Sequence, residues 1–120
     1  MLLRGDPRPR ALKLYPVPPD HPDGRHVIQM VERLRPHTDL QLDPGLALPV
    51  MVGREQDSGR TGVLLPFIPG EPLEGVHYRR IYEQGLSSRL WIAAGLARAL
   101  ARLHAHGVVH GDLAEPNLLV

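Results

Sequence analysis

The sequence predicts an α+β fold, in which a small antiparallel sheet with one helix is followed by a mainly helical region. Three observations support this prediction. Residues 10–15 (RALKLY) alternate in polarity as a strand does. Two apolar runs, 46–52 and 63–68, flank a turn-rich segment and are typical of a hairpin. Apolar residues recur with helical spacing within 23–35 and 88–106.

Composition limits the class of protein. A chain of 120 residues is long enough for one small domain. The formal net charge of +1, without a long basic run, gives no reason to expect nucleic acid or a membrane as a partner. The lack of cysteine excludes disulfides and thiolate metal sites. No apolar run approaches the roughly 20 residues of a membrane helix, and the N-terminus has no signal-like segment, so we expect a soluble, cytoplasmic protein.

The first half of the chain is expected to form the sheet and its helix. Leu2 and Leu3 suggest the end of one strand, and residues 10–15 form the next, so the sheet should use residues 1–15. Lys13 lies within this strand, where a solvated lysine is the ordinary interpretation. A helix should run from about Asp23 to Arg35, because Pro36 stops it. Its apolar stripe is expected to comprise Val27, Met30, Val31 and Leu34.

Glu32 lies beside this stripe, nineteen residues after Lys13. A buried lysine requires an anionic partner, because an unpaired buried charge is costly. Glu32 is the best candidate for that partner, and a solvated glutamate on the polar face is the alternative. The two side chains should then approach within about 4 Å.

The second half of the chain is expected to be helical. A Pro/Gly-rich connector, residues 69–73, follows the second hairpin strand, and residues 75–86 are weakly helical. Residues 88–106 predict the strongest helix, capped by Ser87 or Ser88 and stopped by Gly107. Its apolar face should contain Ile92, Leu96, Leu100 and Leu103. Trp91 is expected in the core, and the arginines on the opposite face in solvent: Arg89, Arg98 and Arg102.

A polar loop follows this helix. It contains one acid, Asp112, and one amide, Asn117, and lies between the short apolar runs 108–109 and 118–120, which we expect to be strands. Such an aspartate can accept a hydroxyl proton, and such an asparagine can hold a divalent metal on a phosphate. An ordinary helix–turn–strand with a polar loop is the alternative interpretation.

The pattern Leu-His-x-x-Gly-Val-Val-His-x-Asp-Leu-x-x-x-Asn, from Leu103 to Asn117, resembles the catalytic loop of protein kinases. Gly111 replaces the arginine of that signature, as in aminoglycoside phosphotransferases. Ala114 stands where Ser/Thr kinases usually carry a lysine. The resemblance implies that Asp112 is catalytic and that Asn117 binds Mg²⁺.

The resemblance also implies a nucleotide site. Lys13 would be the second catalytic residue, holding the ATP phosphates, with Glu32 as its partner. Ala11 and Leu119 would contact adenine, and Leu65 would lie at the back of the pocket. The backbone of residues 66–68 would bind the adenine edge. Pro66 has no N–H, so the donor would be Phe67 or Ile68.

The implied organisation is a partial protein-kinase-like fold. Residues 1–68 would form part of the small, nucleotide-binding lobe, and residues 69–120 the hinge and the start of the large lobe through the catalytic loop. The sequence contains no Gly-x-Gly-x-x-Gly and no Asp-Phe-Gly. We therefore expect a fragment of a kinase-like domain that transfers little phosphate on its own.

Three functions follow from these observations. The first is an ATP- and Mg²⁺-dependent kinase of the Ser/Thr protein type, acting on a protein hydroxyl. The second is a small-molecule phosphotransferase of the aminoglycoside or choline type, which Gly111 and Ala114 favour. The third is a non-catalytic, pseudokinase-like module that binds a partner or a nucleotide, since the second metal-binding aspartate is missing.

Overall fold

The computed structural model describes residues 8–120, apart from the side chains of residues 76–78. The chain divides into two compact units, residues 1–68 and residues 69–120. The fold is α+β with a small three-stranded antiparallel sheet, which confirms the predicted class. The strand end expected at Leu2 and Leu3 lies outside the described residues.

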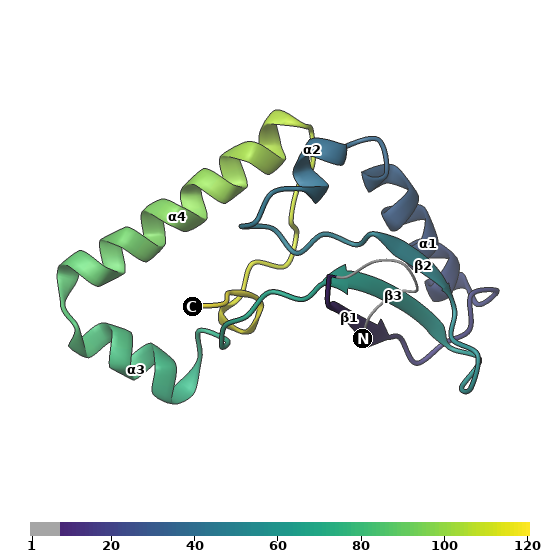
Figure 1. Cartoon of the computed structure of the whole chain (residues 1–120), viewed down its shortest axis with the longest axis horizontal. Coiled ribbons are helices and arrows are strands. Elements are labelled where there is room, and N and C mark those ends of the chain that lie inside the picture. Colours follow the sequence, from purple (N-terminus) through teal and green to yellow (C-terminus); the bar gives the residue numbers. More distant parts are fainter. Residues whose placement is uncertain (1–7) are drawn as a thin grey trace. The chain divides into compact units, whose positions relative to one another are not determined.

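The first unit contains the sheet, formed by β1 (Arg10–Leu14), β2 (Met51–Arg54) and β3 (Thr61–Pro66). The strand order is β1-β3-β2, so β3 is central and pairs with both neighbours (Figure 1). The predicted hairpin is therefore confirmed, but its first strand begins at Met51 rather than Leu46. Pro49 lacks an N–H for the ladder, although the Val50 N–H still donates to the Leu64 carbonyl at 2.8 Å.

Helix α1 (Pro22–Leu34) matches the helix expected before Pro36. Pro22 occupies the first turn, where its missing N–H costs nothing. The Nδ1 atom of His21 caps this end by accepting the Asp23 N–H at 3.2 Å. The predicted stripe is correct for the three buried residues Val27, Val31 and Leu34. Met30 is 39% exposed and lies outside the core, contrary to prediction.

The core of this unit lies between α1 and one face of the sheet. Val27 and Val31 form a buried cluster with Val63 of the central strand. Partly buried residues from all three strand segments pack against that cluster: Tyr15, Val52 and Leu65. A short helix that the sequence did not predict, α2 (Thr38–Gln41), adds Leu40, which is 2% exposed. The packing thus fixes α1 to the sheet face that carries the odd-numbered residues of β1.

The second unit contains α3 (Gly75–Glu83), α4 (Leu86–Ala105) and the short 3-10 helix η1 (Glu115–Asn117). Helix α4 begins at Leu86, after Gly85 with φ +97°, and no side chain caps it. The predicted serine cap is therefore wrong, because Ser87 and Ser88 already belong to the first turn. The predicted stop is correct: the N–H groups of Gly107 (φ +70°) and Val108 close the helix on preceding carbonyls, each at 3.0 Å.

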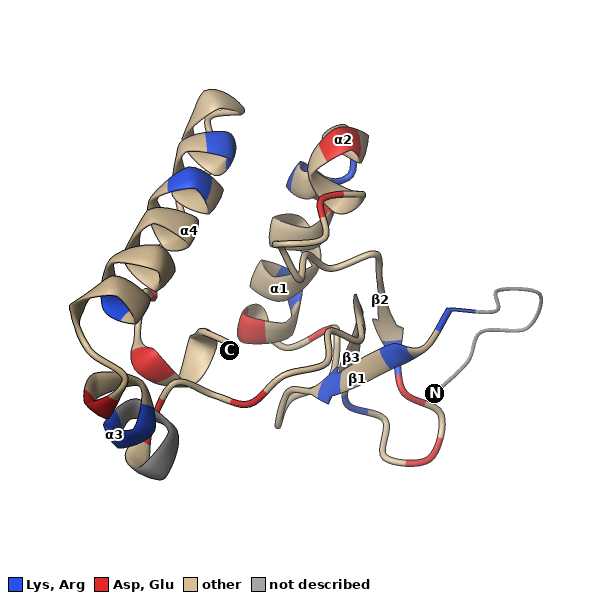
Figure 2. Cartoon of the chain, turned by 60° about the vertical axis from the view of Figure 1, so that its left-hand side comes forward, with Lys and Arg blue, Asp and Glu red and all other residues tan. Residues whose placement is uncertain are grey.

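The exposure of α4 departs from prediction at one residue. Leu103 is 3% exposed, and Ile92, Leu96 and Leu100 on the same face are partly buried. Trp91 is 75% exposed rather than part of the core, because it lies about 120° around the helix from Leu103. The three arginines of α4 are exposed, as expected, and the helix carries no acidic residue (Figure 2). Among the described residues, no helix is long and apolar enough to cross a membrane.

The last residues of the chain pair with the connector before α3. The N–H of Leu73 donates to the Leu118 carbonyl at 2.7 Å, and Glu71 and Val120 exchange two hydrogen bonds at 3.0 and 3.1 Å. A single bridge, Pro72 with Leu119, results. The strands predicted at 108–109 and 118–120 do not form, because residues 118–120 are satisfied by residues 71–73 instead.

Candidate functional site

The loop after α4 brings Asp112 and Asn117 together. Helix η1, which Pro116 favours, turns the chain back, and the Asn117 N–H bonds to the Ala114 carbonyl at 2.9 Å. The Asn117 Nδ2 donates to the Asp112 backbone carbonyl at 2.8 Å and to its Oδ2 at 3.3 Å. Because the amide nitrogen is directed at Asp112, the amide oxygen is the atom that could bind a metal.

Gly111 sets the direction of the backbone immediately before Asp112. Its φ of +78° is in the left-handed region, where a side chain would be strained. This conformation accounts for glycine at the position where the resembling signature has arginine. The Asp112 N–H then donates to the His110 Nδ1 at 3.2 Å. Asp112 and Asn117 are both exposed, so the loop presents one carboxylate and one amide oxygen to solvent.

In the first unit, three predicted site residues share the sheet face that α1 covers. Ala11 and Lys13 lie two positions apart on β1 and therefore share a face, and Ala11 pairs directly with Leu65 of β3. Ala11 and Leu65 are partly buried, and Lys13 is exposed. The register therefore places the lysine on the same sheet face as two apolar side chains, a combination that suits a nucleotide with an adenine ring and charged phosphates.

The predicted pair between Lys13 and Glu32 is not formed within residues 8–120. The Lys13 Nζ lies 5.0 Å from the centroid of the Tyr15 ring. The Glu32 carboxylate instead binds the Arg35 guanidinium, with Oε2 and Nη1 3.3 Å apart. Arg35 follows Glu32 by three residues on the same helix face, so it reaches the carboxylate without any movement of α1. The spacing between Lys13 and Glu32 could not reveal this competitor.

The segment after β3 narrows the choice of adenine-edge donor. The Phe67 N–H already donates to the Pro9 carbonyl at 3.2 Å, which extends the β1–β3 pairing. Ile68 is therefore the better of the two predicted donors. The Phe67 side chain is 56% exposed. In the second unit, Leu119 is 44% exposed and is held by its bridge to Pro72.

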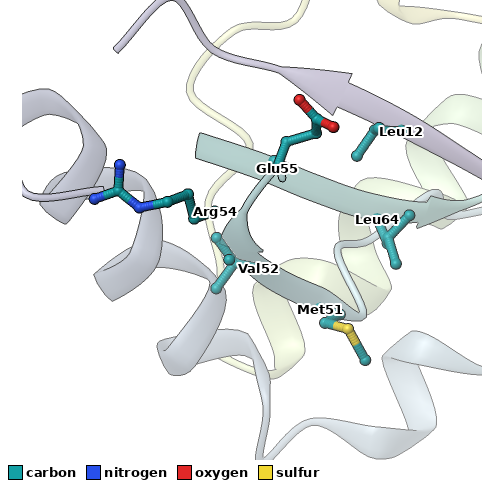
Figure 3. A pocket seen from close by; sticks show the side chains of 8 residues that line it. Leu12, Met51, Val52, Arg54, Glu55 and Leu64 are labelled. Atoms are coloured by element: carbon teal, nitrogen blue, oxygen red, sulfur yellow. The ribbon is translucent and has the colours of Figure 1, made fainter. Parts of the chain in front are cut away.

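The opposite face of the sheet carries a hollow that sequence reasoning did not identify (Figure 3). Leu12, Met51 and Leu64 neighbour one another across the three strands and line it with apolar side chains, and Val52 also lines it. Arg54 and Glu55 also line it. None of the predicted site residues does. The sequence signal for this hollow was the pair Leu12 and Leu14, because alternation along β1 directs both leucines away from α1.

The charges beside this hollow are engaged within the chain. The Arg54 Nη2 lies 3.0 Å from Asp20 Oδ1, and hydrogen bonds from the backbone and from Arg54 lower the pKa of Asp20. The Ser58 hydroxyl and the N–H groups of Asp57 and Ser58 bind the Glu55 carboxylate, which lowers the pKa of Glu55. Within the described part of the chain, no group of three or more His, Cys, Asp or Glu residues is placed to hold a metal.

The chain is similar in sequence to a known protein kinase. A stretch of 77 residues, 64% of the chain, is 32% identical to the DNA damage-responsive serine/threonine-protein kinase RqkA of Deinococcus radiodurans. The aligned stretch covers 12% of the length of that kinase. No family model matches the chain. This partial similarity supports a kinase-like relationship, which is consistent with the small antiparallel sheet and its helix.

Proposed function

We propose that the chain provides nucleotide-binding and catalytic-loop elements of an ATP-dependent phosphotransferase related to Ser/Thr protein kinases. The observation that carries this proposal is the link between Asn117 and Asp112, because it holds a carboxylate and a metal-binding amide in one fixed loop. The similarity to a kinase that is named as serine/threonine-specific supports the same reaction class.

The predicted residues have separate roles in this proposal. Ala11 and Leu65 contact the adenine ring, and the Ile68 N–H binds its edge. Lys13 binds the phosphates, and Glu32 becomes its partner once it leaves Arg35. Bound Mg²⁺ supplies positive charge on the phosphates, and the Asn117 oxygen is the ligand that this chain offers for it.

Asp112 acts on the acceptor rather than on the nucleotide. Its carboxylate accepts the proton of the attacking hydroxyl, and the loop hydrogen bonds keep that carboxylate oriented. Such a role affects the transition state more than the bound ground state.

A small-molecule acceptor is the second candidate. Ala114 leaves the loop without the cation that Ser/Thr kinases place two residues after the aspartate, and Gly111 matches the aminoglycoside phosphotransferase form. Transfer from γ-labelled ATP to a generic protein, to an aminoglycoside and to choline would distinguish the two acceptor classes.

The proposal is tested by calorimetric titration of the chain with ATP over a range of Mg²⁺ concentrations. Asn117→Ala should raise the Mg²⁺ concentration needed for binding. Asn117→Asp is the matched control, because it keeps an oxygen ligand but removes the Nδ2 donor to Asp112, and it should retain the Mg²⁺ dependence. ATP binding that is absent, or that is equally sensitive to Mg²⁺ in wild type and Asn117→Ala, would contradict the proposal.

A further inference from the structure

Lys13 is the only lysine of the chain, and its ammonium has one partner within residues 8–120, the ring of Tyr15. The distance of 5.0 Å from Nζ to the ring centroid is within the range of a cation–π interaction. Glu32, the expected anionic partner, is bound to Arg35. Among the described residues, the Tyr15 ring is therefore the group that lies beside the Lys13 ammonium.

The Tyr15 ring is a well-fixed platform. It packs, partly buried, against the cluster of Val27, Val31 and Val63. Its backbone N–H donates to the Thr61 carbonyl at 2.9 Å, which continues the pairing of β1 with β3 by one residue. Because the ring is packed against the cluster and the Tyr15 backbone is hydrogen-bonded, the residue loses little conformational freedom when a cation binds over the ring.

The neighbours of Lys13 on the sheet favour a position of its ammonium beside Tyr15 over one beside Ala11 or Val63. Residues two positions apart on a strand share a face, so Ala11 and Tyr15 flank Lys13 along β1, and Val63 lies directly opposite. Neither Ala11 nor Val63 offers anything to a cation, whereas the ring face of Tyr15 does. The ring uses none of the three ammonium N–H donors for a conventional hydrogen bond, so they remain able to bind oxygen atoms.

We propose that Tyr15 is a positioning residue that holds the Lys13 ammonium over its ring for contact with the phosphates of a nucleotide. This inference rests on the proposed function, because it assigns Lys13 to the phosphates. It adds a residue that acts through Lys13 and touches no substrate itself.

The contact is measured first, on the full chain labelled with ¹³C at lysine. With a single lysine in the sequence, the ε-methylene gives one unambiguous signal. Ring currents should move that signal upfield in wild type and in Tyr15→Phe, which keeps the ring. The displacement should be lost in Tyr15→Leu and in Tyr15→Met, the latter serving if the leucine variant folds poorly. An ε-methylene shift equal to that of a free lysine in wild type would overturn the inference without any variant.

The functional consequence is measured with ATP, inorganic tripolyphosphate and adenosine as probes. Tyr15→Leu should weaken binding of ATP and of tripolyphosphate about two- to fivefold and leave adenosine unchanged, because only the phosphates contact Lys13. Tyr15→Phe should bind like wild type. In a Lys13→Ala background, Tyr15→Leu should have no further effect.

The outcomes separate this inference from the proposed function. Wild-type binding of ATP that Tyr15→Leu leaves unchanged, or weakens equally for adenosine, would overturn the role of Tyr15 alone. If the wild-type chain binds neither ATP nor tripolyphosphate, the proposed function fails and this role fails with it.

Discussion

Thr61 carries a buried hydroxyl group that lacks a hydrogen-bond partner among the described residues. The residue is fully buried, and its backbone groups are used by Val17 and Tyr15. An unsatisfied buried polar group costs about 1–3 kcal/mol. The hydroxyl therefore weakens the first unit at the point where β3 meets the start of α1.

Replacing Thr61 by Val should leave the free energy of unfolding unchanged or raise it by about 1 kcal/mol, because a methyl of the same shape replaces the unsatisfied hydroxyl. Denaturant unfolding monitored by circular dichroism measures this change. Thr38→Val, at the exposed start of α2, is the control and should bring no gain. A clear loss of stability in Thr61→Val would show that the hydroxyl has a partner in solution.

Single residues also decide the state of the predicted lysine–glutamate pair. Arg35 is 73% exposed and holds Glu32 through a surface ion pair, the kind of interaction that contributes about 0–1 kcal/mol. Glu32 can therefore exchange partners at small cost. This small cost is compatible with a later pairing of Glu32 with Lys13.

At the scale of elements, α1 is placed by a close approach to the chain that precedes it. Gly24 is buried in the first turn, and a Cβ there would meet the backbone carbonyl of Pro18 and lie 2.8 Å from the Thr61 hydroxyl. Only glycine permits this approach, because the carbonyl belongs to the backbone and cannot rotate away. The closeness fixes where α1 begins above the sheet, and with it the position of Glu32.

Gly24→Ala should destabilise the chain by about 1–3 kcal/mol through overpacking, even though alanine favours helices. Gly95→Ala in α4 is the matched control, because nothing lies within 4 Å of its added Cβ, and it should gain up to about 1 kcal/mol. Thermal unfolding of the two variants beside wild type tests the difference in sign. Equal effects would mean that Pro18 does not constrain α1.

Two carboxylates with lowered pKa values, Asp20 and Glu55, form hydrogen bonds at the turn between β2 and β3. The lowered pKa values of Asp20 and Glu55 mean that both carboxylates are bound better in the folded state when ionised. Their stabilising effect should be complete at neutral pH and be lost as the pH falls below about 5 toward their folded pKa values. Urea midpoints measured between pH 7 and pH 3 should decrease over this window.

Two variants separate the carboxylates in this titration. Glu55→Gln should reduce the pH dependence by removing the charge and one of the two oxygens that accept three hydrogen bonds, and Asp20→Asn should do so by removing the ion pair with Arg54. Added salt should weaken the second interaction more than the first, because exposed ion pairs are screened. An unchanged slope in both variants would assign the acid sensitivity to other groups.

At the scale of the whole molecule, the two units carry different parts of the proposed reaction. The first unit holds Ala11, Lys13, Leu65 and Ile68, which the proposed function assigns to the nucleotide. The second holds Asp112 and Asn117 in one loop. Substitutions in the two units should therefore affect different measured quantities.

Asp112→Asn should lower the rate of phosphoryl transfer by about 10²- to 10⁴-fold and leave nucleotide affinity nearly unchanged, since a general base matters mainly in the transition state. Lys13→Ala should weaken ATP binding by about 10- to 100-fold through the loss of charged hydrogen bonds. Calorimetry measures the ATP affinity, and transfer of radiolabelled phosphate measures the rate. Both are carried out on the longest gene product that contains this sequence. If Asp112→Asn lowers affinity and rate together, Asp112 holds the loop and has no separate chemical role.

The sequence by itself determined the features that arise from neighbouring residues. Pro36 set the end of α1, Gly107 set the end of α4, and alternating apolar residues located the strands of the hairpin. The spacing of Asp112 and Asn117 indicated that the two side chains belong to one loop. These signals are local, because a missing N–H, a positive φ or a period of two acts within a few residues.

Only the tertiary structure decided which partner each side chain found. In the structure, Glu32 pairs with Arg35, and the Lys13 ammonium lies over the Tyr15 ring. Trp91 is exposed to solvent, and residues 118–120 pair with residues 71–73. The start of α1 likewise depends on the contact of Gly24 with Pro18 and Thr61, which lie on other segments. Spacing along the chain can suggest several partners for one side chain, but which of them it contacts depends on distances in the folded protein.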